Sequence, residues 1–182
     1  MNALKHLILA SALAVLPSVA AAQAPTGGPH DFDFEFGSWK AHLKRLVHPL
    51  SGSDQWVELD GKSVVHKLWD GRSNLGEFAV ENGSTRLEGM SLRLFNPATH
   101  QWSVYWANAR TGELGTPLVG GFHDGRGEFY SKDTWEGKPI DARFVISVLG
   151  PSSFRLEQAF SPDGRKTWET NWVATFVRSP ES

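Results

Sequence analysis

The stretch that decides the fold is Phe34-Glu35-Phe36-Gly37-Ser38-Trp39-Lys40-Ala41-His42-Leu43. From Trp39 onward apolar and polar side chains alternate, which is the period of a half-buried β-strand. Gly37 permits an unusual φ or a close backbone approach, and Trp39 is bulky enough to fill one end of a barrel. We therefore expect a first strand from residue 34 to 47, with Trp39, Ala41, Leu43, Arg45 and Val47 on its inner face.

The rest of the chain reads as hairpins that complete a barrel. Turn residues such as Asp60-Gly61 and Asn82-Gly83 separate short apolar or alternating segments, and such pairs are strong hairpin signals. We predict strands over residues 34–47, 55–59, 62–69, 75–80, 86–95, 102–108, 128–135, 139–148, 154–160 and 167–178, with 111–124 as a loop or a short edge strand. The fold class is therefore all-β, a single antiparallel up-and-down β-barrel of about ten strands, because closure removes exposed sheet edges.

Three residues carry a resemblance to a known group of barrels. The spacing Gly37-x-Trp39 before a long strand, with Arg178 at the end of the last apolar strand, resembles the calycins, which include lipocalins, fatty-acid-binding proteins and nitrobindin-like proteins. The lead-in Phe32-Asp33-Phe34 is similar to that of an uncharacterised bacterial calycin-like family. The resemblance implies a barrel with a ligand cavity, in which Arg178 lies against Trp39. It implies no particular activity, because calycins include carriers, haem proteins and enzymes.

The first residues of the chain have the features of a secretory signal peptide. Lys5 and His6 form a basic region, residues 7–16 an apolar region, and Ala20-Ala21-Ala22 a small-residue cleavage site. The apolar run is about half the ~20 residues that a membrane-spanning helix needs. We predict a signal peptide over residues 1–22, a flexible lead over 23–32 and one barrel domain over 33–179. The expected location is periplasmic or secreted.

Composition narrows the classes of partner. The formal net charge is −2 and the chain contains no cysteine, so disulfides and a lipid-anchoring cysteine are absent. Charged residues are mixed along the chain, whereas a nucleic-acid surface or an anionic-membrane surface needs a basic stripe. We therefore expect no nucleic-acid partner and no membrane insertion. The sequence carries no signal for an oligomeric state.

Aromatic residues are unusually frequent: eight Trp and eleven Phe stand against two Tyr. One explanation is the interior of a β-barrel, because aromatic side chains suit pleated surfaces. The other is a cavity with aromatic walls for an apolar or planar ligand. Both explanations can hold together.

Polar residues on strand faces that are otherwise apolar are the candidates for a site, because buried polar groups are costly unless they are paired or solvated. In 86–95, Glu88, Met90, Leu92 and Leu94 share one face, opposite Arg93. In 62–69, Val64, His66 and Leu68 are expected to face inward. The predicted ligand-binding residues are Arg45, Glu58, His66, Glu88, Met90, Trp106, Asn108, Gln158, Thr170 and Trp172.

Three functions remain open on these residues. The preferred one is binding of a small apolar or aromatic molecule in the barrel. The alternative is a cofactor-free lyase, isomerase or hydrolase, with His66 as acid–base and with Arg45 and Glu88 positioning the substrate. No nucleophile motif and no metal-ligand spacing of histidines is present, so we predict no metal and no cofactor. A nitrobindin-like haem site, which needs one axial histidine, is the third candidate.

Overall fold

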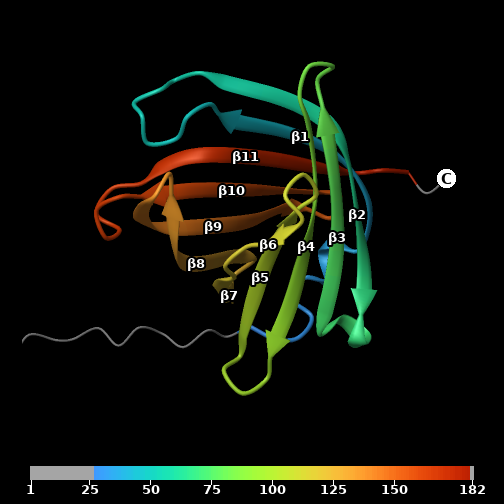
Figure 1. The fold of residues 1–182 in the computed structure, drawn as a ribbon. Helices are drawn as coiled ribbons and strands as arrows, with labels where there is room; N and C mark the ends of the chain where they lie inside the picture. Colours follow the sequence, from blue (N-terminus) through green and yellow to red (C-terminus); the bar gives the residue numbers. More distant parts are fainter. Residues whose placement is uncertain (1–26, 181–182) are drawn as a thin grey trace, which may run out of the picture.

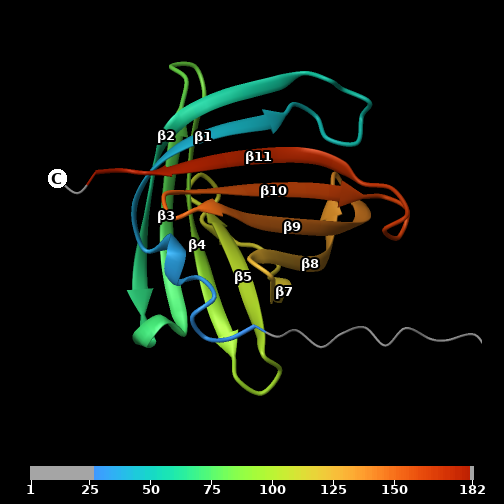
Figure 2. The same cartoon turned by 180° about the vertical axis from the view of Figure 1, so that it is seen from behind.

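The structure, a computed structural model, describes residues 27–180. Ten antiparallel strands form a closed ring, in which β4 pairs with β5 and β1 pairs with β11. One half of the barrel, β2 to β5, crosses the other half, β8 to β11, at a steep angle (Figures 1 and 2). The strands are β1 (Gly37–Leu46), β2 (Trp56–Leu68), β3 (Ser73–Glu81), β4 (Arg86–Asn96), β5 (Gln101–Asn108), β6 (Glu113–Leu114), β7 (Leu118–His123), β8 (Arg126–Trp135), β9 (Lys138–Gly150), β10 (Ser153–Ser161) and β11 (Glu169–Arg178).

The predicted all-β barrel is confirmed. The segment 111–124, predicted as a loop or short edge strand, contributes β7 to the ring and the two-residue β6 beside β5. Two short 3-10 helices, η1 (Asp33–Glu35) and η2 (Trp69–Gly71), are the helical elements of the described range. No helix within residues 27–180 has the length and apolar character needed to cross a membrane. The predicted signal peptide, residues 1–22, lies outside the described residues.

The barrel closes at the base where the first and last strands meet. Gly37 adopts a φ of 103°, which L-residues with a Cβ rarely adopt. Trp39 pairs in register with Arg178, whose guanidinium lies 4.2 Å from the centre of the indole ring. The same guanidinium donates hydrogen bonds to the carbonyls of Phe34 and Phe36, at 2.8 and 2.9 Å. The predicted contact between Trp39 and Arg178 is confirmed.

Residues just before η1 pack against the same end of the barrel. Phe32 is fully buried and contacts the rings of Trp102, Phe122 and Phe129. The indole nitrogen of Trp102 donates to the carbonyl of Gly28. The end of the predicted lead therefore helps to close the base, and the aromatic content serves the core as well as the cavity.

The predicted hairpin around Asp60-Gly61 is wrong. β2 is a single strand of 13 residues that runs through this pair, in continuous register with β1 and β3. A Cβ on Gly61 would lie 2.0 Å from the carbonyl oxygen of Ala79, so glycine is needed here for a close approach of two strands, not for a turn. Ser63 and Val65 face inward, so the predicted inward facing of Val64 and His66 is wrong. The error does not come from the predicted turn, since Glu58, which precedes it, also lies on the outer face.

The predicted facing of β4 is also wrong. Leu87, Ser91 and Arg93 point into the barrel, whereas Met90 is exposed. The strand carries leucines on both faces, so apolar content alone does not identify its inner face. Arg93 is tolerated inside because Glu35 of η1 lies beside it. By contrast, the predicted inner faces of β5, with Trp102, Val104 and Trp106, and of β10, with Phe154, Leu156 and Phe160, are confirmed.

Candidate functional site

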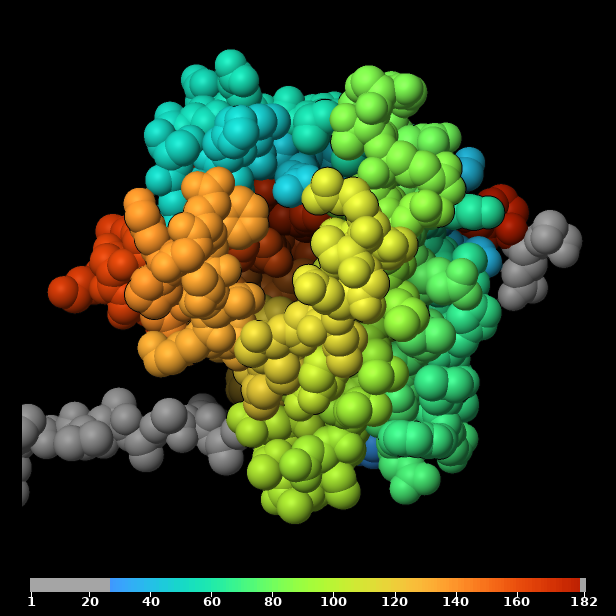
Figure 3. All heavy atoms as spheres, viewed as in Figure 1, coloured from blue at the N-terminus to red at the C-terminus, as the bar shows by residue number. Residues whose placement is uncertain are grey.

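A cavity of about 590 Å³ occupies the barrel interior. It opens at the end of the barrel opposite Trp39, where β1, β5, β8 and β10 end and β4, β9 and β11 begin. Figure 3 shows the opening between the β8–β9 turn, in orange, and the segment around β6, in yellow. A volume of this size is within the range of pockets that hold small molecules.

The walls of the cavity are mainly aromatic. Phe78 lies about 6 Å, between ring centres, from each of Trp106, Trp172 and Phe176, and all four residues line the cavity. The ring centres of Trp106 and Trp172 are 6.4 Å apart, and the two rings meet at 66°. Phe144 and Phe154 extend this lining along β9 and β10. Such a lining favours a planar or apolar ligand, because aromatic contacts add to the free energy of apolar burial.

One wall carries a polar cluster that the strand register explains. Arg45 of β1 pairs with Trp172 of β11, which pairs with Gln158 of β10, so these three residues lie in one row across neighbouring strands. A register shift after Gln158 leaves Asn171 as an extra residue of β11. Such a β-bulge re-aims a side chain, and Asn171 lines the cavity in addition to Trp172.

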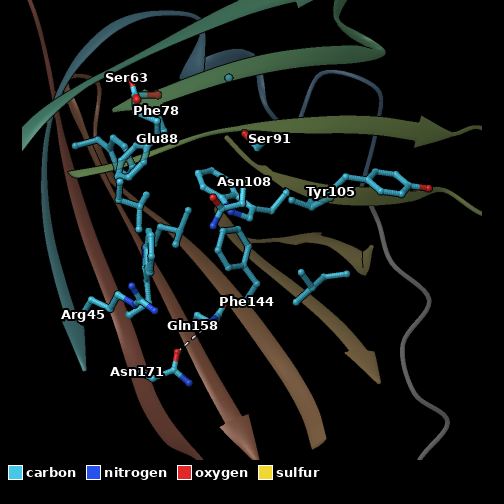
Figure 4. A pocket seen from close by; sticks show the side chains of 18 of the residues that line it. Arg45, Ser63, Phe78, Glu88, Ser91, Tyr105, Asn108, Phe144, Gln158 and Asn171 are labelled. Carbon is cyan, nitrogen blue, oxygen red and sulfur yellow. Dashed lines mark hydrogen bonds between the residues drawn. The ribbon is translucent and has the colours of Figure 1, made fainter. Parts of the chain in front are cut away.

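Asn171 is held by its neighbour on β10. The Nε2 of Gln158 donates a hydrogen bond of 3.0 Å to the Oδ1 of Asn171, and Figure 4 shows Arg45, Gln158 and Asn171 on the same wall. Asn171 is 2% exposed, and its Nδ2 has no hydrogen-bond partner among the described residues. A buried amide donor without a partner is costly, and a ligand oxygen that reached this Nδ2 would supply the missing acceptor.

The floor of the cavity contains a buried ion pair. Glu35 and Arg93 are 2.9 Å apart and only 0% and 5% exposed, although neither carboxylate oxygen has a hydrogen bond of good geometry. Arg93 also donates to the Oδ1 of Asn74, at 2.8 Å, and lies over the ring of Phe32. Burial raises the pKa of the Glu35 carboxyl above its ordinary value, and the nearby Arg93 opposes this only in part.

The mouth is rich in arginine. Arg86 pairs with Glu88 at 2.6 Å and with Glu81 at 3.0 Å, and its hydrogen bond lowers the pKa of Glu88. Arg110 lines the cavity beside Asn108, whose Oδ1 accepts a hydrogen bond from the Arg110 backbone. Among residues 27–180, the rim therefore presents one guanidinium paired with carboxylates, that of Arg86, and one without an ion-pair partner, that of Arg110.

Of the predicted ligand-binding residues, six line the cavity: Arg45, Glu88, Trp106, Asn108, Gln158 and Trp172. The other four do not line it. Glu58 pairs with Lys44 at 2.9 Å on the outer face, and that hydrogen bond lowers its pKa. His66 is 53% exposed and lies 3.4 Å from Glu77, and Met90 is exposed. The bulge brings Asn171, in place of Thr170, into the cavity wall.

Sequence reasoning missed Glu35, Arg93 and Asn171. Arg93 gave the best signal, as a charged residue in the middle of a strand with leucines on both sides. Glu35 lies in η1, just before the first strand, where strand alternation gives no information. Asn171 faces the cavity because of a bulge, and the sequence has no marker for that bulge.

The residues present do not offer the ligands of a metal or haem site. Within residues 27–180 no group of three or more histidine, aspartate and glutamate side chains could hold a metal ion. No histidine is among the described residues that line the cavity, so the axial ligand of a nitrobindin-like haem has no counterpart there. The geometry instead suits a bound organic molecule.

The comparisons with known proteins bear on the fold. No family model and no curated protein matches the chain. Among solved structures, an S-type phycobiliprotein lyase from Guillardia theta is similar, with a TM-score of 0.58 and 12% sequence identity. The match covers 83% of this chain and 92% of the lyase. A redesigned β-barrel aligns with a TM-score of 0.45 and 8% identity, over 86% of this chain and all of its own. The likeness to the lyase concerns the fold, a closed antiparallel β-barrel.

Proposed function

We propose that this protein binds a small apolar or aromatic molecule inside its barrel. The observation that carries the proposal is the open cavity of about 590 Å³ with aromatic walls and a few inward polar groups. A barrel that served only as a structural domain would fill this space with its own side chains, because protein interiors are close-packed. The lyase that shares the fold acts, by its name, on phycobiliproteins, and a barrel with a ligand cavity is compatible with that relationship.

The rival function, a cofactor-free reaction in the same cavity, receives less support. Its acid–base residue was expected to be His66, which lies on the outer face of β2 beside Glu77. Arg45 and Glu88 line the cavity without it, and Glu88 is held by Arg86 at the rim. Arg86 lowers the pKa of the Glu88 carboxyl, so Glu88 is a weak proton acceptor and, with Arg45, is better suited to position a ligand than to move a proton. We therefore favour the binder.

The proposal predicts that filling the cavity abolishes binding. Ser91 is a small residue that lines it, so in Ser91→Phe a ring would occupy space that the ligand needs. We expect the Kd for N-phenyl-1-naphthylamine, a neutral fluorescent probe, to rise about tenfold or more. A tenfold rise corresponds to a loss of about 1.4 kcal/mol of binding free energy. Fluorescence titration measures Kd directly. At a free concentration one hundred times its Kd, the probe is expected to raise the free energy of unfolding of the wild-type protein by about 2.7 kcal/mol.

The matched control is Ser103→Phe on β5, which adds the same ring at a position that does not line the cavity. This variant should bind the probe as the wild type does. Equal binding by both variants, or no binding by the wild type, would contradict a ligand site in the barrel. Mass analysis of molecules extracted from the native protein then separates the two functions. A ligand recovered unchanged supports the binder, whereas its chemical conversion by the purified protein supports the rival.

We also propose that the protein is exported and belongs to the bacterial calycin-like family that its Phe32-Asp33-Phe34 lead-in resembles. Export rests on the order of charge, apolar run and alanine-rich site in residues 1–22. We expect mass spectrometry of the protein from a periplasmic fraction to find Gln23 at the amino terminus. A cytoplasmic protein that begins at Met1 would exclude export.

A further inference from the structure

We propose that the ligand carries a carboxylate, and that Arg45 and Asn171 bind it on the β1–β11 wall. The inference rests on the proposed function, because it assigns a chemical class to the molecule in the same cavity. Three independent observations lead to it: the charges that line the cavity, the direction of the hydrogen bond between Gln158 and Asn171, and the apolar surface that lies next to both.

The charges lining the cavity leave a positive excess. Its charged residues are Glu35, Arg45, Arg86, Glu88, Arg93 and Arg110. Both glutamates have arginine partners, since Glu35 pairs with Arg93 and Glu88 with Arg86. Arg45 and Arg110 form no ion pair with an acidic residue in the range 27–180. The chain as a whole has a formal net charge of −2, so two free cations at the cavity do not follow from its general composition.

The amide beside Arg45 also presents a donor. Gln158 donates to the Oδ1 of Asn171, which uses the acceptor of Asn171 and leaves its Nδ2 pointing away from that bond. This Nδ2 is buried and without a partner in the described structure. An arginine has five N–H donors and no acceptor. The two side chains therefore present donors and one fixed positive charge, and a cluster of this kind favours an oxyanion over an ammonium group.

The surroundings favour a carboxylate over a phosphate. A guanidinium binds a carboxylate through two parallel hydrogen bonds, and one arginine with one amide supplies enough donors for its two oxygens. Trp172 pairs in register with Arg45 and follows Asn171 in the chain. Beyond it the wall continues as Phe78 and Phe176. A molecule held here by its acid group would extend its apolar part over these rings.

The test compares two probes that share one aromatic body. 1-Pyrenebutyric acid carries the carboxylate, and 1-pyrenebutanol replaces it by a neutral hydroxyl. We expect the wild-type protein to bind the acid about 10- to 100-fold more tightly at pH 7, which is the range expected of a charge-assisted hydrogen bond. In Arg45→Met and in Asn171→Leu this preference should fall toward one while the Kd of the alcohol stays the same. Arg45 is exposed, so its replacement is expected to leave the fold intact.

Arg155→Met is the matched control, because Arg155 is an exposed arginine on β10 that pairs with Glu157 outside the cavity. It should keep the full preference for the acid. If the wild type binds both probes equally, or if the preference survives in Arg45→Met, the carboxylate site is overturned while the proposed function stands. If neither probe binds and N-phenyl-1-naphthylamine also fails, the proposed function itself is overturned.

Discussion

Replacing Arg93 by methionine is expected to lower the free energy of unfolding by about 3–5 kcal/mol at pH 8, because the change leaves a buried carboxylate without its partner. Glu35 is fully buried, and Arg93 lies 2.9 Å from it. Arg93 also donates a hydrogen bond to the buried Asn74, which the variant loses. Urea unfolding monitored by tryptophan fluorescence measures the change, provided that the denaturant dependence is the same in both proteins.

The stability lost in Arg93→Met should be larger at high pH than at low pH. Burial already raises the pKa of Glu35, and Arg93 is the group that opposes this rise, so in Arg93→Met the pKa rises further. A carboxyl with a folded-state pKa above its unfolded value destabilises the fold as pH increases between the two values. The difference between wild type and variant should therefore be smaller at pH 4.5, where an ordinary glutamate carboxyl is half protonated, than at pH 8. A difference that grows on acidification would contradict the assignment.

The double variant Glu35→Leu with Arg93→Met provides the control. Replacing both members of a buried pair by apolar residues is often neutral, so the double variant is expected to be more stable than Arg93→Met alone. Full recovery is not expected, because Asn74 still lacks its donor. A double variant as unstable as the sum of the two single changes would show that the charges do not interact.

Replacing Trp39 by alanine is expected to have a second large effect, about 3–5 kcal/mol, since a fully buried tryptophan leaves a large void. Trp39 is 1% exposed. Its indole nitrogen donates to the carbonyl of Glu35 at 2.7 Å, and its ring contacts Phe154 and the guanidinium of Arg178. The substitution removes the packing that closes the base, and thermal and urea unfolding measure the loss.

The contact with Arg178 is isolated by a double-mutant cycle. Arg178→Met loses the cation over the indole and two hydrogen bonds to the carbonyls of Phe34 and Phe36. We expect the cycle with Trp39→Ala to give a coupling of about 0.5–2 kcal/mol, the range for a cation over an aromatic ring. The double variant should then be less destabilised than the sum of the single variants. Strict additivity would show that the contact contributes nothing.

The alternation of side chains was sufficient to predict most strands and the closed barrel. It worked best where one face is uniformly apolar, as in β10, with Phe154, Leu156 and Phe160 inward. It failed for β2, because Asp60-Gly61 has the composition of a turn although Gly61 serves a close contact with β3. It failed for β4 because the inner face of that strand carries Arg93, whose partner Glu35 is distant in the chain.

The candidate site was predictable to the same extent as the strands that form it. Trp106, Asn108, Gln158 and Trp172 line the cavity and lie on faces that the sequence identified. Asn171 enters through a bulge, and a bulge depends on how β11 pairs with β10. His66 lies outside because Leu59, Ser63 and Val65 form the inner face of β2. With Val64 and Val65 on opposite faces, alternation alone does not identify the buried face of this strand.

The amino-acid sequence by itself determined the all-β class and most of the strands, because these follow from local alternation. The meeting of Trp39 with Arg178 was expected from the resemblance to calycins. Only the tertiary structure decided which charged groups are buried and which donors face the cavity. The ion pair of Glu35 with Arg93 and the cluster of Arg45, Gln158 and Asn171 each join side chains from different strands or from η1. Their chemistry depends on register and burial, and both are properties of the assembled barrel.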